Sequence, residues 1–164
     1  MDAIEEKNRK TLVVYASKHG AAREAARRIA AKIEGAVTHD LAQGGLPALA
    51  GFDRVILGSS VYAGRIRKEA KDFLTQNTDV LYGKQLGLFL CGMDTNCAQN
   101  YFDANFSLDI LQAAKAASFV GGIYDPKKAG FFERFIYKVA AKQSDYADTL
   151  DDGKIHQFAE AMNA

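Results

Sequence analysis

The clearest candidate for chemistry is a short polar turn at residues 17–23, which reads SKHGAAR and joins an apolar run to an amphipathic one. Such a turn exposes several backbone N–H groups beside the positive end of the following helix dipole. Gly20 would allow a ligand to approach the backbone without meeting a side chain. This combination predicts a site for a phosphate monoester, although Gly and Ser also occur in strand-to-helix turns for their geometry alone.

Three other phosphate chemistries do not match this turn. The dinucleotide fingerprint needs three glycines at fixed spacing, and the nucleoside triphosphate loop needs Gly followed by Lys and then Ser or Thr. A phosphorelay receiver domain would need acidic residues after its first strand and an acceptor Asp after its third, where this chain reads AS at residues 16–17 and GSS at residues 58–60. The sequence therefore disfavours NAD, ATP and phosphorelay.

The other reactive side chains form no recognisable pattern. We interpret Cys91 as a small buried hydrophobe, and Cys97 lacks a neighbour in sequence that would stabilise a thiolate. His19, His39 and His156 are too scattered to suggest metal ligands, so we predict no metal. The formal net charge of +1, from 21 Lys and Arg against 20 Asp and Glu, disfavours nucleic acid as a partner.

The elements that position the turn alternate between strands and helices. We expect strands over residues 11–16, 36–41, 52–60, 85–91 and 117–123, and helices over 21–33, 68–77, 101–117, 130–142 and 153–162. Crossover helices place such strands in a parallel sheet that is buried on both faces, with ligands at the carboxyl ends of the strands. The pattern predicts one doubly wound α/β domain over residues 11–164, preceded by a flexible leader at residues 1–10.

Three segments resemble a known superfamily. YASKHGAAREAARRIA (residues 15–30) resembles the FMN-phosphate loop and first helix of the flavodoxin superfamily. FDRVILGSSVYAGRIRKEAKDFL (residues 52–74) resembles the third strand and following loop of its menaquinone-dependent protoporphyrinogen oxidase branch. GFFERFIYKVAAKQS (residues 130–144) is similar to a helical segment that this branch inserts after the fifth strand. The resemblance implies a flavodoxin-like fold with five parallel strands in the order 2-1-3-4-5, helices on both faces and a bound FMN.

The resemblance also implies which residues bind FMN. The turn would hold the phosphate through backbone amides and the Ser17 hydroxyl, but Ala22 departs from the Thr or Ser that flavodoxins usually have there. Tyr62 would stack on the ring, unless it is only a surface aromatic beside a glycine turn. The implied cofactor-binding residues are Ser17, Lys18, His19, Gly20, Ala21, Ala22, Ser59, Ser60, Val61, Tyr62, Ala63, Gly64, Cys91, Gly92, Met93, Asp94, Thr95 and Asn96.

The predicted helix over residues 130–142 is amphipathic and basic. Its apolar stripe consists of Phe131, Phe132, Phe135, Ile136 and Val139, whereas Arg134, Lys138 and Lys142 share another face. Five cations and two anions between residues 125 and 142 give a local charge of +3. We favour the interpretation that the stripe packs on the domain; alternatively, Phe131 to Lys142 contact an anionic membrane surface, where a lipid-soluble quinone would be within reach.

FMN would carry the redox chemistry itself, so no catalytic side chain is required. We therefore predict an FMN-binding redox protein for electron transfer, or a protoporphyrinogen IX oxidase with a quinone acceptor. The near-neutral charge favours the oxidase, because electron-transfer flavodoxins are typically acidic. The expected partners are a redox protein, a quinone or a porphyrinogen, and the expected location is the cytoplasm or the inner membrane face. The alternative is a flavin-free interaction module with the same fold.

Overall fold

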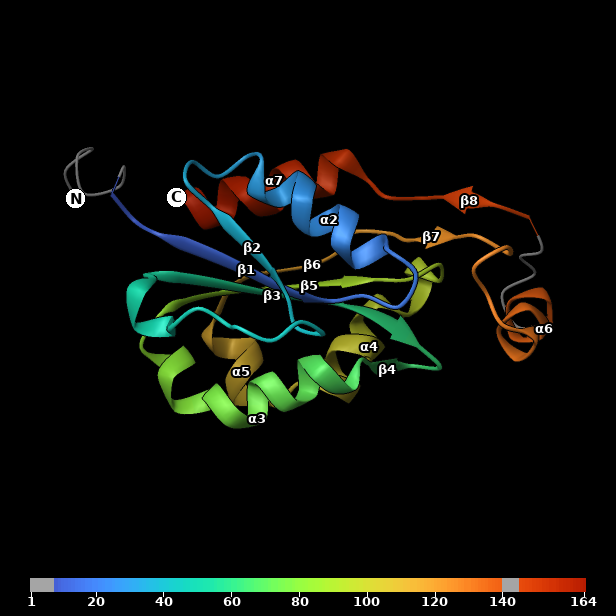
Figure 1. Ribbon diagram of the computed structural model, residues 1–164, viewed down its shortest axis with the longest axis horizontal. Coiled ribbons are helices and arrows are strands. Elements are labelled where there is room, and N and C mark those ends of the chain that lie inside the picture. Colours follow the sequence, from blue (N-terminus) through green and yellow to red (C-terminus); the bar gives the residue numbers. More distant parts are fainter. Residues whose placement is uncertain (1–7, 140–144) are drawn as a thin grey trace.

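Five parallel strands form the centre of the computed structural model, which describes residues 8–139 and 145–164 (Figure 1). The strands are β1 (Thr11–Ala16), β2 (Val37–Asp40), β3 (Arg54–Tyr62), β5 (Gln85–Cys91) and β6 (Ala114–Phe119). They pair in the order β2-β1-β3-β5-β6, which confirms the predicted order of the five main strands. Most of the predicted leader, at residues 1–7, lies outside the described residues.

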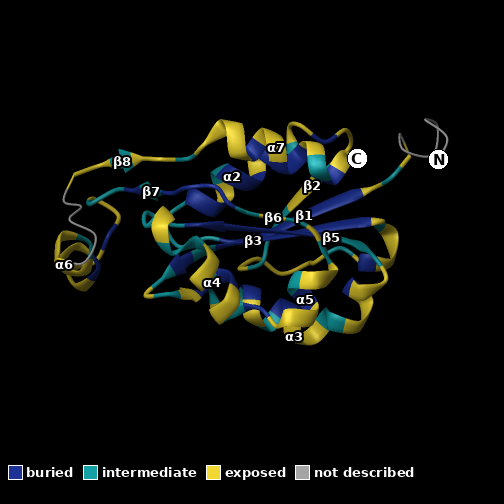
Figure 2. Cartoon of the chain, turned by 180° about the vertical axis from the view of Figure 1, so that it is seen from behind, coloured by how far each residue is buried: buried dark blue, intermediate teal, exposed yellow. Residues whose placement is uncertain are grey.

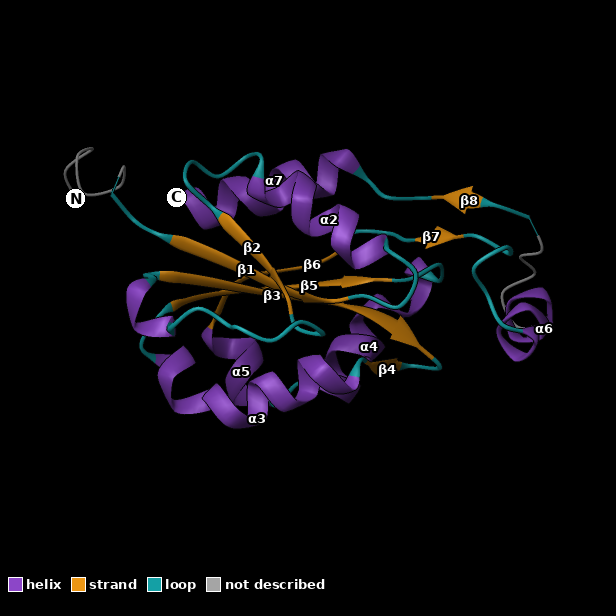
Figure 3. Ribbon diagram, in the orientation of Figure 1, coloured by secondary structure: helices purple, strands orange, loops and turns teal. Residues whose placement is uncertain are grey.

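Helices cover both faces of the sheet (Figure 3). One layer contains α2 (Ala21–Ala30) and α7 (Asp152–Asn163), and the other contains α3 (Lys68–Tyr82), α4 (Ala98–Asn105) and α5 (Leu108–Ala113). Alternate residues of β1 point into the two layers, because Leu12 and Val14 belong to the core under α3 whereas Val13 packs with α2 and α7. The central strands β1, β3 and β5 are therefore buried on both sides, as their apolar runs predicted.

The single helix predicted over residues 101–117 is wrong. The chain forms α4 and α5 there, and Ser107 caps α5 by accepting a hydrogen bond from the Ile110 amide at 3.2 Å. The edge strand β6 begins at Ala114, three residues before the predicted start of that strand. Its alanines favour a helix locally, but hydrogen bonding to β5 outweighs this preference.

Other boundaries moved by a few residues. Helix α2 ends at Ala30 rather than at residue 33, and helix α3 continues past residue 77 to Tyr82 because Leu81 is buried in the core. A short strand β4 (Arg65–Ile66) pairs with the end of β3, and two short 3-10 helices occupy Leu49–Gly51 and Thr95–Cys97.

The inserted segment stands at the carboxyl end of the sheet. A two-stranded ribbon of β7 (Ile123–Tyr124) and β8 (Ala147–Asp148) extends beyond the sheet, and helix α6 (Phe131–Val139) lies at its far end (Figure 1). Lys142 and the end of the predicted helix lie outside the described residues. Figure 2 shows α6 as largely exposed.

The interpretation that the apolar stripe packs on the domain is wrong. Phe131, Phe132 and Phe135 are 74%, 76% and 60% exposed, and Val139 is also exposed. The side of α6 that faces the domain instead carries Glu133, which is buried. These four side chains remain in solvent because they lie on a different side of the helix from Glu133, whereas Ile136, three residues after Glu133, is only 38% exposed.

Candidate functional site

The turn between β1 and α2 has the geometry that phosphate binding requires. Gly20 is the N-cap of α2 and has φ 103°, a left-handed conformation that favours glycine. The Ser17 hydroxyl accepts a hydrogen bond from the Gly20 amide at 3.0 Å, which fixes the turn and leaves the hydroxyl proton free to donate. The first N–H groups of a helix have no acceptor within it, so the start of α2 presents donors to an anion.

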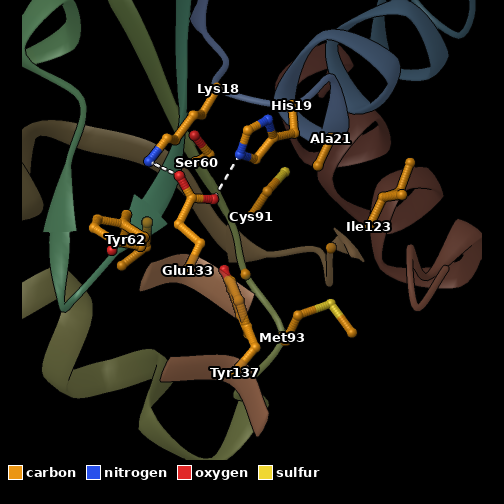
Figure 4. Close-up of a pocket in the computed structure, with 13 residues that line it drawn as sticks. Lys18, His19, Ala21, Ser60, Tyr62, Cys91, Met93, Ile123, Glu133 and Tyr137 are labelled. Atoms are coloured by element: carbon orange, nitrogen blue, oxygen red, sulfur yellow. Dashed lines mark hydrogen bonds and ion pairs between the residues drawn. The ribbon is translucent and has the colours of Figure 1, made fainter. Parts of the chain in front are cut away.

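A cleft opens beside this turn and consists of two adjoining pockets with cavity volumes of about 40 Å³ and 170 Å³. Both pockets are lined by Val61, Tyr62, Gly92, Met93 and Tyr137, so they form one continuous cleft. Figure 4 shows residues that line the first pocket. It lies where the carboxyl ends of β1, β3 and β5 meet, the usual ligand site of a doubly wound sheet. The predicted site residues that line it are Lys18, His19, Ala21, Ser60, Val61, Tyr62, Ala63, Gly64, Cys91, Gly92, Met93 and Asp94.

The remaining predicted site residues do not line the cleft. Ser17 and Gly20 belong to the turn beside it, and Thr95 and Asn96 lie in a 3-10 helix. The Ala22 methyl is fully buried in the core between α2 and α7.

Ser59 is buried and serves the chain itself. Its hydroxyl accepts from the Arg67 amide and donates to the Ser60 carbonyl, both at 2.9 Å. The side chain is thus occupied in joining β3 to the start of α3.

Helix α6 supplies lining residues that the sequence analysis did not assign to the site. They are Glu133, Ile136 and Tyr137, and Tyr101, Gly122 and Ile123 also line the cleft. Glu133 and Tyr137 are four residues apart and therefore share one side of the helix. This spacing could have indicated from the sequence that both side chains face the same way. The prediction for this helix was based instead on its apolar stripe and its basic residues.

The cleft contains a compact charged cluster. Glu133 pairs with Lys18 through one carboxylate oxygen and lies 2.6 Å from His19 Nε2 through the other (Figure 4). Burial raises the pKa of the Glu133 carboxyl, but hydrogen bonds from Lys18 and His19 outweigh burial and hold that pKa below its ordinary value. The Lys18 ammonium also lies 4.1 Å from the centre of the Tyr62 ring, as a cation–π contact.

Aromatic rings form much of the wall opposite the turn. Tyr101 stacks on Phe119 with ring centres 5.8 Å apart, and Tyr137 packs on Tyr124 at 4.6 Å. Burial raises the pKa of the Tyr137 hydroxyl, so this side chain is neutral at physiological pH. With Tyr62, these rings give the cleft flat apolar surfaces suited to a planar ligand.

The two thiols are poor redox groups. Cys91 is fully buried, as predicted, and burial raises its pKa. The Cys97 thiol donates a hydrogen bond to Asp94 at 3.3 Å, and this bond raises the pKa of Cys97. Neither sulfur is a thiolate at neutral pH, which disfavours thiol chemistry at the cleft.

Comparison with known proteins places this chain in a known domain family. Residues 12–151 match the flavodoxin domain model, so the chain belongs to the flavodoxin domain family. FMN is the cofactor, and electron transfer the general role, that membership of this family implies. No curated protein matches the sequence.

Solved flavodoxins share the architecture. A short-chain flavodoxin associated with a non-canonical PDU bacterial microcompartment has a TM-score of 0.58 at 17% identity, with 93% of this chain and 95% of that chain covered. Oxidised flavodoxin 1 from Bacillus cereus has a TM-score of 0.56 at 15% identity, with 93% of this chain and 96% of that chain covered. Two-electron reduced Megasphaera elsdenii flavodoxin has a TM-score of 0.56 at 15% identity, with 93% of this chain and 98% of that chain covered. At these identities the likeness shows the fold alone.

The residues of the cleft fit FMN. Ser60 Oγ is buried in the wall of the first pocket and has no hydrogen-bond partner among the described residues, so a polar ligand group would satisfy it. The turn offers donors for a phosphate, and the tyrosines offer surfaces for a planar ring. Within residues 8–139 and 145–164, no three His, Cys, Asp or Glu side chains gather as a metal site would require.

Proposed function

We propose that the chain transfers electrons through an FMN held in this cleft, with its phosphate at the turn and its ring among the tyrosines. The single observation that supports this arrangement is the cleft at the switch point of the sheet, bounded by a glycine-capped helix N-terminus and an aromatic wall. When bound, FMN supplies one-electron and two-electron transfer. The side chains need only bind, orient and shield it.

Each part of the cleft has a distinct task in this proposal. The Ser17 hydroxyl and the amides at the start of α2 hold the phosphate, and Ser60 offers a hydrogen bond to a polar group of the ligand. The rings of Tyr62 and Tyr137 exclude water from the flat face of the ligand.

The finer candidate is oxidation of a porphyrinogen with a quinone as acceptor. It is supported by the resemblance of residues 52–74 and 130–144 to the oxidase branch, and by a net charge of +1. FMN-loaded protein, mixed anaerobically with protoporphyrinogen IX and a menaquinone analogue, is expected to form fluorescent porphyrin as the quinone is reduced. Protein without FMN is the control. An inactive FMN-loaded sample would reject the oxidase and leave electron transfer to a protein partner.

The exposed face of α6 suits an anionic lipid surface. Its outward side chains are apolar or basic, with Phe131, Phe132 and Phe135 beside Arg134 and Lys138. The one acid of this helix, Glu133, turns inward and is paired, so no carboxylate of the helix opposes a negative surface. Each basic residue near such a surface contributes about 1 kcal/mol. No helix among the described residues has the length and apolar character to cross a bilayer.

Vesicle sedimentation tests this docking surface. We expect the chain to bind phosphatidylcholine vesicles that contain phosphatidylglycerol, and the double variant Phe131→Ser/Phe135→Ser to bind about tenfold less, because it loses the apolar anchor. Leu108→Ser removes an exposed apolar residue from α5, 69% exposed, and should bind like the wild type. Equal binding by the double variant would contradict the proposal, and so would a stable dimer that buries this face.

A further inference from the structure

We propose that Glu133 is an internal anion that competes with the FMN phosphate for Lys18 and His19, and so sets how tightly the cleft holds FMN. The inference rests on the proposed function. It assigns to Glu133 the role of a specificity-determining residue that limits the contribution of the phosphate to binding.

The contacts of Glu133 carry the inference. Among the described residues that line the first pocket, Glu133 is the sole acid and Lys18 and His19 are the sole basic side chains. Only 10% of the Glu133 side chain is exposed, and its two oxygens each contact one of the two bases. Both bases belong to the turn that would receive the phosphate. The carboxylate thus neutralises Lys18 and occupies His19 Nε2, the two basic side chains nearest to the phosphate site.

The fold brings this carboxylate from a distant part of the chain. Glu133 lies 114 residues after His19, on a helix that reaches the cleft through the ribbon of β7 and β8. The rest of α6 is largely exposed, so its ion pairs with the turn are a main attachment of the helix to the domain. A helix placed for packing alone would have buried its phenylalanines instead.

Electrostatics gives the direction of the effect. A phosphate monoester carries about −1.5 to −2 charges near pH 7 and favours the same two basic side chains. While Glu133 holds Lys18 and His19, the phosphate gains their attraction only by weakening the existing pairs. Gln at position 133 keeps the size and an oxygen acceptor but removes the charge, so both bases become available to the phosphate.

The test compares FMN with riboflavin, which has the same ring but no phosphate. In titrations followed by flavin fluorescence, Glu133→Gln is expected to lower the Kd for FMN about tenfold and to leave the Kd for riboflavin within about twofold. Glu34→Gln makes the same charge change at an exposed position beyond the end of α2 and should alter neither Kd. In a Lys18→Met/His19→Gln background, the gain from Glu133→Gln should disappear.

The possible results separate this inference from the proposed function. An unchanged or higher FMN Kd in Glu133→Gln would overturn the competition while the proposed function stands. Equal tightening of FMN and riboflavin would also overturn it, because the carboxylate would then act on the ring site. A wild-type chain that binds neither flavin would overturn the proposed function and this inference together.

Discussion

Replacing Ser17 with Asp is expected to weaken FMN binding about 100-fold while leaving the fold intact. An Asp carboxylate can accept the Gly20 amide as the Ser17 hydroxyl does at 3.0 Å, and an acid at the start of a helix is favourable for the helix itself. The same carboxylate would lie beside the phosphate, where two like charges about 4 Å apart repel by up to about 4 kcal/mol in partly screened surroundings. The Kd of the Ser17→Asp variant for FMN, measured by fluorescence quenching, tests the expected loss of affinity.

Ser17→Asn is the matched control, because Asn has the same shape as Asp and also caps a helix but carries no charge. We expect Ser17→Asn to stay within about threefold of the wild type, since it removes one hydroxyl contact and adds no repulsion. Riboflavin should bind both variants alike. Equal FMN affinity for Ser17→Asp and Ser17→Asn would place the phosphate away from this turn.

Replacing Gly121 with Ala is expected to lower the free energy of unfolding by about 3 kcal/mol. Gly121 has φ 88°, and a Cβ there would lie 2.0 Å from the carbonyl oxygen of Thr149. The backbone around Thr149 cannot move away without breaking hydrogen bonds. The Thr149 amide donates to the Gly122 carbonyl at 2.8 Å, and the Gly121 carbonyl accepts from the Gly92 amide at 3.0 Å. Urea denaturation, analysed with matched m-values, measures the loss.

Gly44→Ala is the control for this prediction. A Cβ at Gly44 meets nothing within 4 Å, and this glycine has no positive φ. The free energy of unfolding of the Gly44→Ala variant should stay within about 0.5 kcal/mol of the wild-type value. A Gly121→Ala variant that is equally stable would show that the loop carrying Gly122 and Ile123 into the cleft packs less closely than the structure has it.

Residues close together in sequence determined most of what could be predicted. The apolar runs of β1, β3 and β5 are continuous because both faces of each strand are covered. The alternation with helices predicted parallel pairing, whereas the strand order was implied by the family resemblance. The turn at residues 17–23 and the loops after β3 and β5 were found because ligand sites of such sheets lie at the strand ends.

The predictions for β6 and α6 were wrong because contacts with residues distant in sequence outweigh local conformational preference. The alanines of β6 form a strand only because β5 pairs with them. The phenylalanines of α6 are exposed because Glu133, at a single position, directs the opposite side of the helix to Lys18 and His19. No periodicity in the sequence reveals a pairing across 114 residues.

Titration of the purified wild-type chain with FMN, beside riboflavin, tests the central claim most directly. The chain contains no Trp, so flavin fluorescence and absorbance report binding with little interference from the protein. We predict saturation at one FMN per chain, with quenched fluorescence from the ring stacked among tyrosines, and weaker binding of riboflavin. Unchanged FMN fluorescence at saturating protein, or equal affinity for the two flavins, would contradict a site built on the turn at Ser17.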